Sequence, residues 1–165
     1  MQKWPRSDTL DMGDSMIKSH WIDYFWRLAN EVATKSKDDR KVGALLVADD
    51  LSIRSTGFNG FPRGCSDHPT LYEDRDTKLR RVVHAEANAI VQAAKSGTST
   101  DGCTLVVNWH PCSQCAALII NAGIKRVICA PVDRDSKWLS SFTEASRMLN
   151  EADIEVIHWS HYEHR

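Results

Sequence analysis

The sequence predicts an α/β fold, with a three-layer α-β-α sandwich built on a five-stranded mixed sheet. A stretch of helical period comes first, and two short apolar runs separated by a turn follow it. Strand and helix patterns then alternate along the rest of the chain. Because helical crossovers make successive strands parallel and place helices on both faces of a sheet, we expect an N-terminal antiparallel hairpin and parallel later strands. A length of 165 residues with 42% hydrophobic content fits one core.

The first expected helix runs from about His20 to Lys35. Apolar residues recur there at helical spacing, and polar residues fall on the other side. The apolar stripe is wide and aromatic, which fits core packing, with a subunit contact as the alternative. Residues 1–18 are polar, so we expect a loose N-terminal arm there and a single domain over residues 19–165.

The hairpin is expected next. Residues 42–48 form an almost continuous apolar run, as in a strand from the buried middle of a sheet. The Asp-Asp pair at 49–50 turns the chain into a second strand over residues 52–57. Residues 58–69 are full of turn formers and predict a long loop, while residues 70–83 are strongly charged and lead to the next helix.

Three helices and three strands are expected in the second half of the chain. The strands are short apolar runs, and the helices carry apolar residues at helical spacing. In order, the expected elements are a helix over residues 84–94, a strand over 103–108, a helix over 112–122, a strand over 125–130, a helix over 141–150 and a strand over 154–159.

Composition limits the partners and the compartment. Lys and Arg total 21 against 22 Asp and Glu, whereas a nucleic-acid binder usually shows a basic excess, so we expect no nucleic-acid partner. An odd number of cysteines, five, argues for a reducing compartment rather than a disulfide framework. The start lacks the apolar core of a signal peptide, and no stretch approaches 18 apolar residues, so we expect a cytoplasmic protein without a membrane partner.

The residues best suited to bind a metal and to transfer protons lie in two stretches, His84-Ala85-Glu86 and Pro111-Cys112-Ser113-Gln114-Cys115. Cys112 and Cys115 share one face of the first turn of a helix, where the helix dipole favours thiolates. One His and two Cys are a zinc set that leaves a fourth position for water, and Glu86 remains free to move protons. A structural Cys-x-x-Cys beside an unrelated His is the alternative, but such a site would want a fourth protein ligand.

The spacing His-x-Glu followed by Pro-Cys-x-x-Cys matches the signature of zinc nucleobase deaminases. The chain resembles the deoxycytidylate deaminases of the cytidine and deoxycytidylate deaminase superfamily over roughly residues 20–158. The stretches that carry the resemblance are Ser36-Lys37-Asp38 through Val42-Gly43-Ala44, residues 56–67 with Thr-Gly-Phe-Asn-Gly-Phe-Pro-Arg-Gly-Cys-Ser-Asp, and His84-Ala85-Glu86-Ala87-Asn88-Ala89-Ile90. The resemblance implies a sandwich of the cytidine deaminase type.

That resemblance also implies an activity. It implies that His84, Cys112 and Cys115 hold one Zn²⁺ ion and that the protein is a hydrolase converting dCMP to dUMP and ammonia. Glu86 would take a proton from water, protonate N3 of the cytosine and later protonate the departing amino group. The dUMP would supply thymidylate synthesis.

Base and sugar contacts follow from the same resemblance. It implies that the backbone N–H of Ala85 fixes the base and that the loop containing Trp109 and His110 lines its edge. Asn59 resembles the family's sugar-contacting asparagine, and an asparagine in a Gly-rich turn is the structural alternative.

A 5′-phosphate needs a cradle of cations or N–H groups. Arg40 is the first candidate and Lys37 the second, because their segment resembles the family's phosphate side, although either could be surface charge. Family members often place an aromatic residue after the fourth strand, whereas residues 131–134 read Pro-Val-Asp-Arg here. Trp138 could cover the pocket, with core packing as the alternative.

Regulation is also implied by the resemblance. It suggests a hexamer with dCTP as activator and dTTP as inhibitor, bound with Mg²⁺ near Gly60, Phe61 and Arg63. Three other functions compete with dCMP deamination. They are deamination of another cytosine compound such as 5-substituted dCMP or cytidine, deamination of adenosine in transfer RNA, and nucleotide binding without turnover by a regulator of the same fold. Transfer RNA would require a basic surface, and a pure binder has no need of Glu86.

Overall fold

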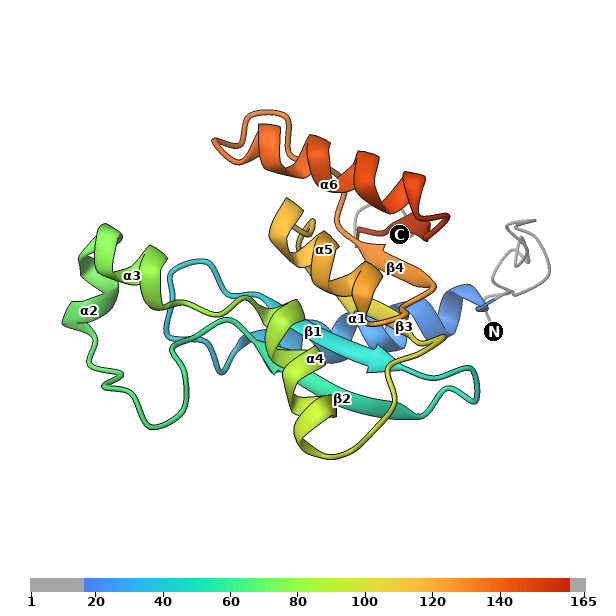
Figure 1. The fold of residues 1–165 in the computed structure, drawn as a ribbon, viewed down its shortest axis with the longest axis horizontal. Helices are drawn as coiled ribbons and strands as arrows, with labels where there is room; N and C mark the ends of the chain where they lie inside the picture. The colour runs from blue at the N-terminus through green and yellow to red at the C-terminus, as the bar shows by residue number, and fades with distance from the viewer. Residues whose placement is uncertain (1–16, 161–165) are drawn as a thin grey trace, which may run out of the picture.

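The computed structural model describes residues 17–160 of the chain (Figure 1). The N-terminal arm expected over residues 1–18 therefore lies almost wholly outside the described residues. In chain order the elements are α1 (Ser19–Ala33), β1 (Gly43–Val47), β2 (Ile53–Phe58), α2 (Thr70–Glu73), α3 (Arg75–Arg81), α4 (Ala85–Lys95), β3 (Thr104–Val107), α5 (Ser113–Asn121), β4 (Arg126–Cys129), α6 (Leu139–Glu151) and β5 (Glu155–His158). From residue 17 to residue 160, no helix has the length and apolar character needed to cross a lipid bilayer.

The five strands form one sheet in the order β2-β1-β3-β4-β5. Strand β1 pairs antiparallel with β2 and with β3, whereas β3, β4 and β5 are parallel. The predicted mixed sheet, with an antiparallel hairpin and parallel later strands, is confirmed. Since β1 alone runs in the opposite direction, its N-terminal end meets the C-terminal ends of the other strands at one edge of the sheet. Ligands of α/β proteins bind outside such an edge.

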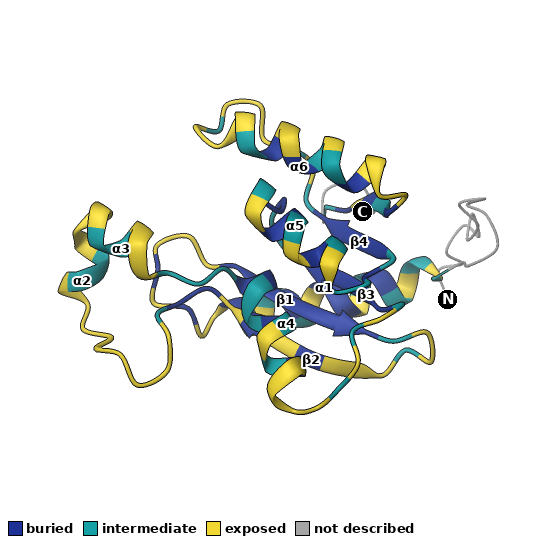
Figure 2. Cartoon of the chain, viewed as in Figure 1, coloured by how far each residue is buried: buried dark blue, intermediate teal, exposed yellow. Residues whose placement is uncertain are grey.

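Helices cover both faces of the sheet, which confirms the three-layer sandwich. Leu45 and Val47 point to the face covered by α1, and Ala44 and Leu46 point to the face covered by α4, α5 and α6. This alternation follows from the two-residue period of a strand. Because both faces are covered, every residue of β1 is buried, as the colouring in Figure 2 shows.

Two glycines let the hairpin approach the helices closely. A Cβ atom added to Gly43 would lie 2.1 Å from the carbonyl oxygen of Ala29 in α1. One added to Gly57 would lie 2.3 Å from the carbonyl oxygen of Ala85 and 2.4 Å from the backbone nitrogen of Ala89 in α4. Any side chain at Gly57 would therefore displace the start of α4 from the sheet.

Helices α2 and α3 were not predicted from the sequence. They belong to residues 61–82, here called the excursion, which projects away from the sheet in Figure 1. Backbone hydrogen bonds between Gly60 and Val83, at 3.0 and 2.8 Å, close its base. Asp74 caps α3 by accepting a hydrogen bond from the backbone N–H of Thr77. No residue of either helix is buried, so the apolar period that reveals a packed helix is absent here.

Candidate active site

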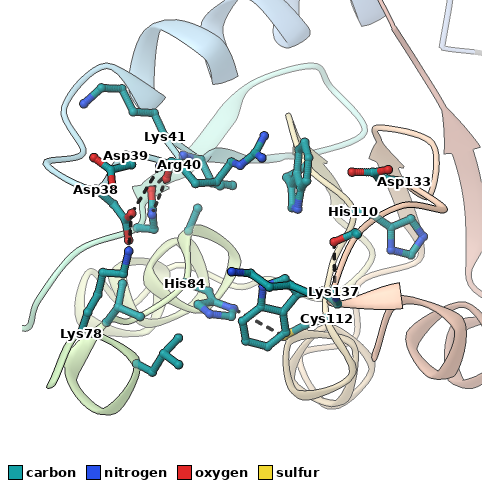
Figure 3. Close-up of a pocket in the computed structure, with 18 of the residues that line it drawn as sticks. Asp38, Asp39, Arg40, Lys41, Lys78, His84, His110, Cys112, Asp133 and Lys137 are labelled. Atoms are coloured by element: carbon teal, nitrogen blue, oxygen red, sulfur yellow. Dashed lines mark hydrogen bonds and ion pairs between the residues drawn. The ribbon is translucent and has the colours of Figure 1, made fainter. Parts of the chain in front are cut away.

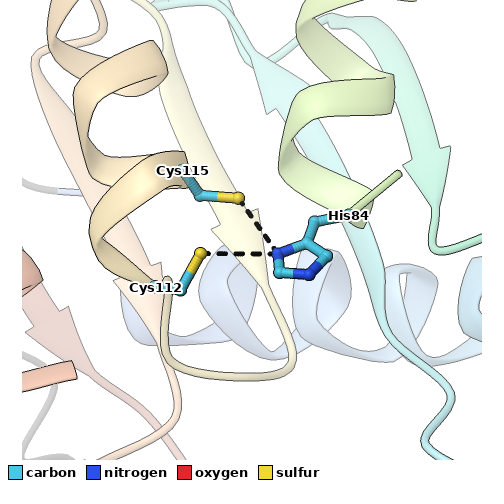
Figure 4. A group of neighbouring side chains, drawn as sticks. All are labelled: His84, Cys112 and Cys115. Carbon is cyan, nitrogen blue, oxygen red and sulfur yellow. Dashed lines mark hydrogen bonds between the residues drawn. The ribbon is translucent and has the colours of Figure 1, made fainter. Parts of the chain in front are cut away.

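The side chains of His84, Cys112 and Cys115 converge where two helices begin (Figure 4). His84 is the N-cap of α4, Cys112 is the N-cap of α5, and Cys115 lies in the first turn of α5. The Nδ1 atom of His84 lies 3.4 Å from each sulfur, and the three ligand atoms lie within 4.8 Å of one another. Across the described part of the chain, no other three His, Cys, Asp or Glu side chains gather this closely. The predicted convergence of these residues is confirmed.

The donors of this triad fit zinc. One nitrogen and two sulfurs make a familiar catalytic zinc set, and no fourth side chain from residues 17–160 completes it. A hydrogen bond from Cys115 lowers the pKa of Cys112, and the same bond together with burial raises the pKa of Cys115. A divalent cation would favour the thiolate form of both sulfurs, because metal binding releases protons from thiols.

Glu86 lies in the first turn of α4, two residues after His84, and is only 4% exposed. Burial raises the pKa of its carboxyl, and the neighbouring His84 opposes that effect. A raised pKa makes a carboxylate a better proton acceptor, and the carboxyl group so formed can return the proton. Its location therefore suits a proton shuttle better than a fourth metal ligand.

A cavity of about 940 Å³ opens onto this triad (Figure 3). Its walls come from the connector before β1, defined as residues 34–42, and from the loops after β2, β3 and β4. All four segments leave the sheet at the edge where the strand ends meet. The residues expected to bind metal, move protons or contact substrate that line this cavity are Arg40, Asn59, His84, Ala85, Glu86, Trp109, His110 and Cys112.

The buried amide of Asn59 holds the connector in place. Its Oδ1 accepts a hydrogen bond from the backbone N–H of Val42 at 2.8 Å, and its Nδ2 donates to the carbonyl oxygen of Arg40 at 2.8 Å. This is the structural role that the sequence left open as an alternative. Asn59 also lines the cavity, so the sugar contact stays a prediction.

The two phosphate candidates have different surroundings. The guanidinium of Arg40 lies over the Trp109 ring, with its Cζ atom 4.0 Å from the ring centroid, and both residues line the cavity. Lys37 instead forms an ion pair of 2.5 Å with Asp67 in the excursion and is absent from the lining. The structure therefore brings Arg40, but not Lys37, to the cavity.

His110 is buried and connects the loop after β3 to α6. Its Nδ1 lies 3.0 Å from the carbonyl oxygen of Pro111, and its Nε2 lies 3.2 Å from the hydroxyl of Ser146. A carbonyl only accepts, so Nδ1 carries the proton, whereas the Ser146 hydroxyl also donates to the carbonyl oxygen of Phe142 at 3.0 Å. Burial lowers the pKa of His110, which keeps the ring neutral. His110 thereby holds the turn that presents Cys112.

The residues suggested for effectors lie outside this cavity. Gly60 closes the base of the excursion, and the Phe61 ring stacks on Tyr72 with centroids 4.2 Å apart. Arg63 donates to the side-chain oxygen of Gln92 at 3.2 Å. These contacts are structural, and effector binding stays a prediction.

Several cavity residues were missed as candidate substrate contacts in the sequence analysis. From the loop after β4 come Asp133 and Lys137, and from α3 comes Lys78. Trp138, which the sequence analysis considered as a cover for the pocket, also lines the cavity. The usable signal was positional, because a loop that follows a parallel strand opens at the ligand-binding edge of the sheet.

Comparison with known proteins identifies the family. Residues 19–131 match the family model of the cytidine and deoxycytidylate deaminase zinc-binding region. Human deoxycytidylate deaminase is 44% identical over 114 residues, which are 66% of this chain and 63% of the human protein, so the match spans less than two thirds of that relative. Mouse deoxycytidylate deaminase is 41% identical over 135 residues, covering 78% of this chain and 73% of the mouse protein.

A solved structure agrees with these sequence relatives. The dCMP deaminase from the cyanophage S-TIM5, in complex with dCMP and dUMP, superimposes with a TM-score of 0.69 at 28% identity, covering 87% of this chain and all (100%) of that one. The fold shared with this enzyme, the match to the family model over residues 19–131 and the triad within those residues all indicate the same family. The chain therefore belongs to the cytidine and deoxycytidylate deaminase family, with His84, Cys112 and Cys115 as its zinc-binding site.

Proposed function

We propose that this protein is a zinc-dependent hydrolase that converts dCMP and water to dUMP and ammonia. The observation that carries the proposal is the buried carboxyl of Glu86 beside the triad, inside a cavity of about 940 Å³. That volume suits a small molecule such as a nucleotide. The deoxycytidylate deaminase relatives, and the cyanophage enzyme in complex with dCMP and dUMP, support the choice of base and sugar.

Zinc, when bound, lowers the pKa of its water from about 16 toward 7 and so supplies a nucleophile at neutral pH. Glu86 accepts a proton from the attacking water and passes it to N3 of the cytosine. A bond from oxygen to C4 forms, and the bond from C4 to the amino nitrogen then breaks. Glu86 delivers the second proton of the water to the departing nitrogen, so that ammonia leaves and dUMP remains.

Two further groups position the base. Ala85 is the first residue of α4, and the N–H groups of a first helical turn have no partner within the helix. Its N–H can therefore donate to a base held against the start of α4. The neutral ring of His110 closes the neighbouring wall and keeps bulk water from the reacting atoms.

The decisive experiment compares ammonia release from dCMP, cytidine, dCTP and 5-methyl-dCMP. We expect dCMP to have the highest kcat/KM. The Glu86→Gln variant, which keeps the shape of the side chain, should lose turnover by at least about 10²-fold while retaining zinc by elemental analysis. Faster turnover of cytidine, or no ammonia from any nucleotide, would refute the assignment to dCMP.

A further inference from the structure

The cavity lining carries more cations than its ion pairs use. The five lining cations are Arg40, Lys41, Arg75, Lys78 and Lys137. Lys78 is paired with Asp38 at 3.2 Å, and Lys41 donates to the carbonyl oxygen of Ser36. Within the described residues, the other three lining cations have no carboxylate partner. They are therefore available to an anionic ligand.

Arg40 is held ready for such a ligand at both ends. Its guanidinium is stacked on Trp109, with the Cζ atom 4.0 Å from the ring centroid, which orients the plane without using its N–H groups. Its carbonyl oxygen accepts the hydrogen bond from Asn59. Trp109 and Asn59 are thus positioning residues for Arg40.

Lys137 reaches the cavity from the loop after β4. Figure 3 shows its side chain extending from this loop into the cavity, while Arg40 lies at the wall formed by the connector. Within the loop, the backbone N–H of Asp135 donates to Asp133 Oδ1 at 3.0 Å, and that of Trp138 donates to Ser136 Oγ at 3.1 Å. These bonds order the segment that presents Lys137.

The third cation, Arg75, has weaker support from the fold. It begins α3 in the excursion, which has no buried residue in either of its helices. Lys137, by contrast, lies between β4 in the sheet and α6, whose Phe142 and Leu149 are packed in the core. An anion site needs fixed geometry. The loop after β4 therefore provides a better second cation, Lys137, than the excursion provides in Arg75.

We propose that Arg40 and Lys137 form the two sides of the site that binds the 5′-phosphate, and that Lys137 makes the enzyme select nucleotides over nucleosides. The inference rests on the proposed function. A guanidinium can bind a phosphate in a bidentate manner, and an ammonium adds a mobile point charge. The lining also carries carboxylates, among them Asp39 and Asp133, which repel a phosphate dianion. Binding of the phosphate is therefore favoured only between Arg40 and Lys137.

The test is the steady-state kinetics of Lys137→Gln with dCMP and with deoxycytidine. We expect the KM for dCMP to rise about 10-fold to 100-fold, the size of a lost charge-assisted hydrogen bond, with kcat within about twofold. The kcat/KM for deoxycytidine, which has no phosphate, should not change. Arg40→Gln should show the same split, and Lys137→Arg should restore most of the affinity.

Arg134→Gln is the matched control, because Arg134 lies in the same loop, carries the same charge and does not line the cavity. Its KM for dCMP should equal that of the wild type. An unchanged KM in Lys137→Gln, an equal rise in Arg134→Gln, or an equal loss on dCMP and deoxycytidine would each overturn the inference.

The two proposals fail in different ways. Wild-type turnover of dCMP tests the proposed function, whereas the differences among variants test the phosphate site. Calorimetric binding of dUMP and of deoxyuridine to the same variants addresses the phosphate site by affinity alone, independently of turnover. Weaker binding of dUMP but not of deoxyuridine to Lys137→Gln supports the site, and equal binding refutes it.

Discussion

The carboxylate of Asp38 and the ammonium of Lys78 form an ion pair of 3.2 Å, which joins the connector before β1 to α3 of the excursion. Their side chains are 9% and 21% exposed, so the pair is well shielded from water. Both residues also line the cavity. The ion pair therefore holds the excursion next to the cavity.

Lys78→Met should therefore destabilise the protein. It leaves the nearly buried carboxylate of Asp38 without its cation, and we expect a loss of roughly 1–3 kcal/mol in the free energy of unfolding. Urea denaturation measures this loss. Arg80→Met is the control, because the Arg80–Asp76 pair has side chains that are 77% and 76% exposed and such pairs contribute little. Equal effects of the two substitutions would contradict the prediction.

Gly57→Ala should disturb the metal site through the backbone. The new Cβ would lie 2.3 Å from the carbonyl oxygen of Ala85, so α4 must move and carry His84 with it. We expect a loss of roughly 2–3 kcal/mol in unfolding free energy and reduced zinc content after dialysis. At Gly60 the nearest atom would lie at 3.6 Å, so Gly60→Ala should keep its zinc. Full zinc retention by Gly57→Ala would show that α4 tolerates the shift.

Removal of zinc should lower the melting temperature as well as abolish activity. Metal bound to the native state alone stabilises it by about 2.7 kcal/mol at a hundredfold excess over Kd. Cys115→Ser should weaken zinc binding and remove most of this effect, as measured by calorimetry with and without chelator. Cys65→Ser, at an exposed cysteine outside the triad, should bind one zinc ion per chain as the wild type does. A chelator that leaves the wild-type melting temperature unchanged would disprove this role of the metal.

Tyr72 should make the protein less stable at alkaline pH. Burial, with the hydrogen bond to Asp67, raises the pKa of Tyr72 from 10.0 to about 12. A raised folded-state pKa gives stability that is complete below pH 10 and is lost as the pH rises toward about 12. Urea denaturation between these values should show a smaller loss for Tyr72→Phe than for the wild type. A spectrophotometric titration that gives Tyr72 its ordinary midpoint would contradict the assignment.

The metal site was predictable because its signals are local. His84, Cys112 and Cys115 each stand at the start of a helix, and the apolar runs that define those helices are visible in the sequence. Burial on both sides of the sheet likewise marks β1 as a run of apolar residues. Period therefore sufficed for the five strands and the helices that pack on them, and the match to the His-x-Glu and Pro-Cys-x-x-Cys signature sufficed for the triad.

The walls of the cavity were less predictable, because side-chain direction in loops depends on distant partners. Lys37 points to Asp67, which lies 30 residues away in sequence, whereas Lys137 has no such partner among the described residues and lines the cavity. Helices α2 and α3 escaped prediction because neither buries a residue. Neither the partner of a loop side chain nor a helix without buried residues produces a hydrophobic period in the sequence.

At the shared sheet edge, the zinc ligands and the proposed phosphate contact Lys137 belong to different segments of the chain. The ligands for zinc sit at the starts of α4 and α5, while Lys137 and Trp138 follow β4 on a different segment of chain. Exchanging that segment with the one from a relative should therefore change the contribution of Lys137 to phosphate binding and leave the zinc ligands in place. New specificities within this architecture could then arise from short replacements in the connector and in the loop after β4, with the zinc ligands unchanged.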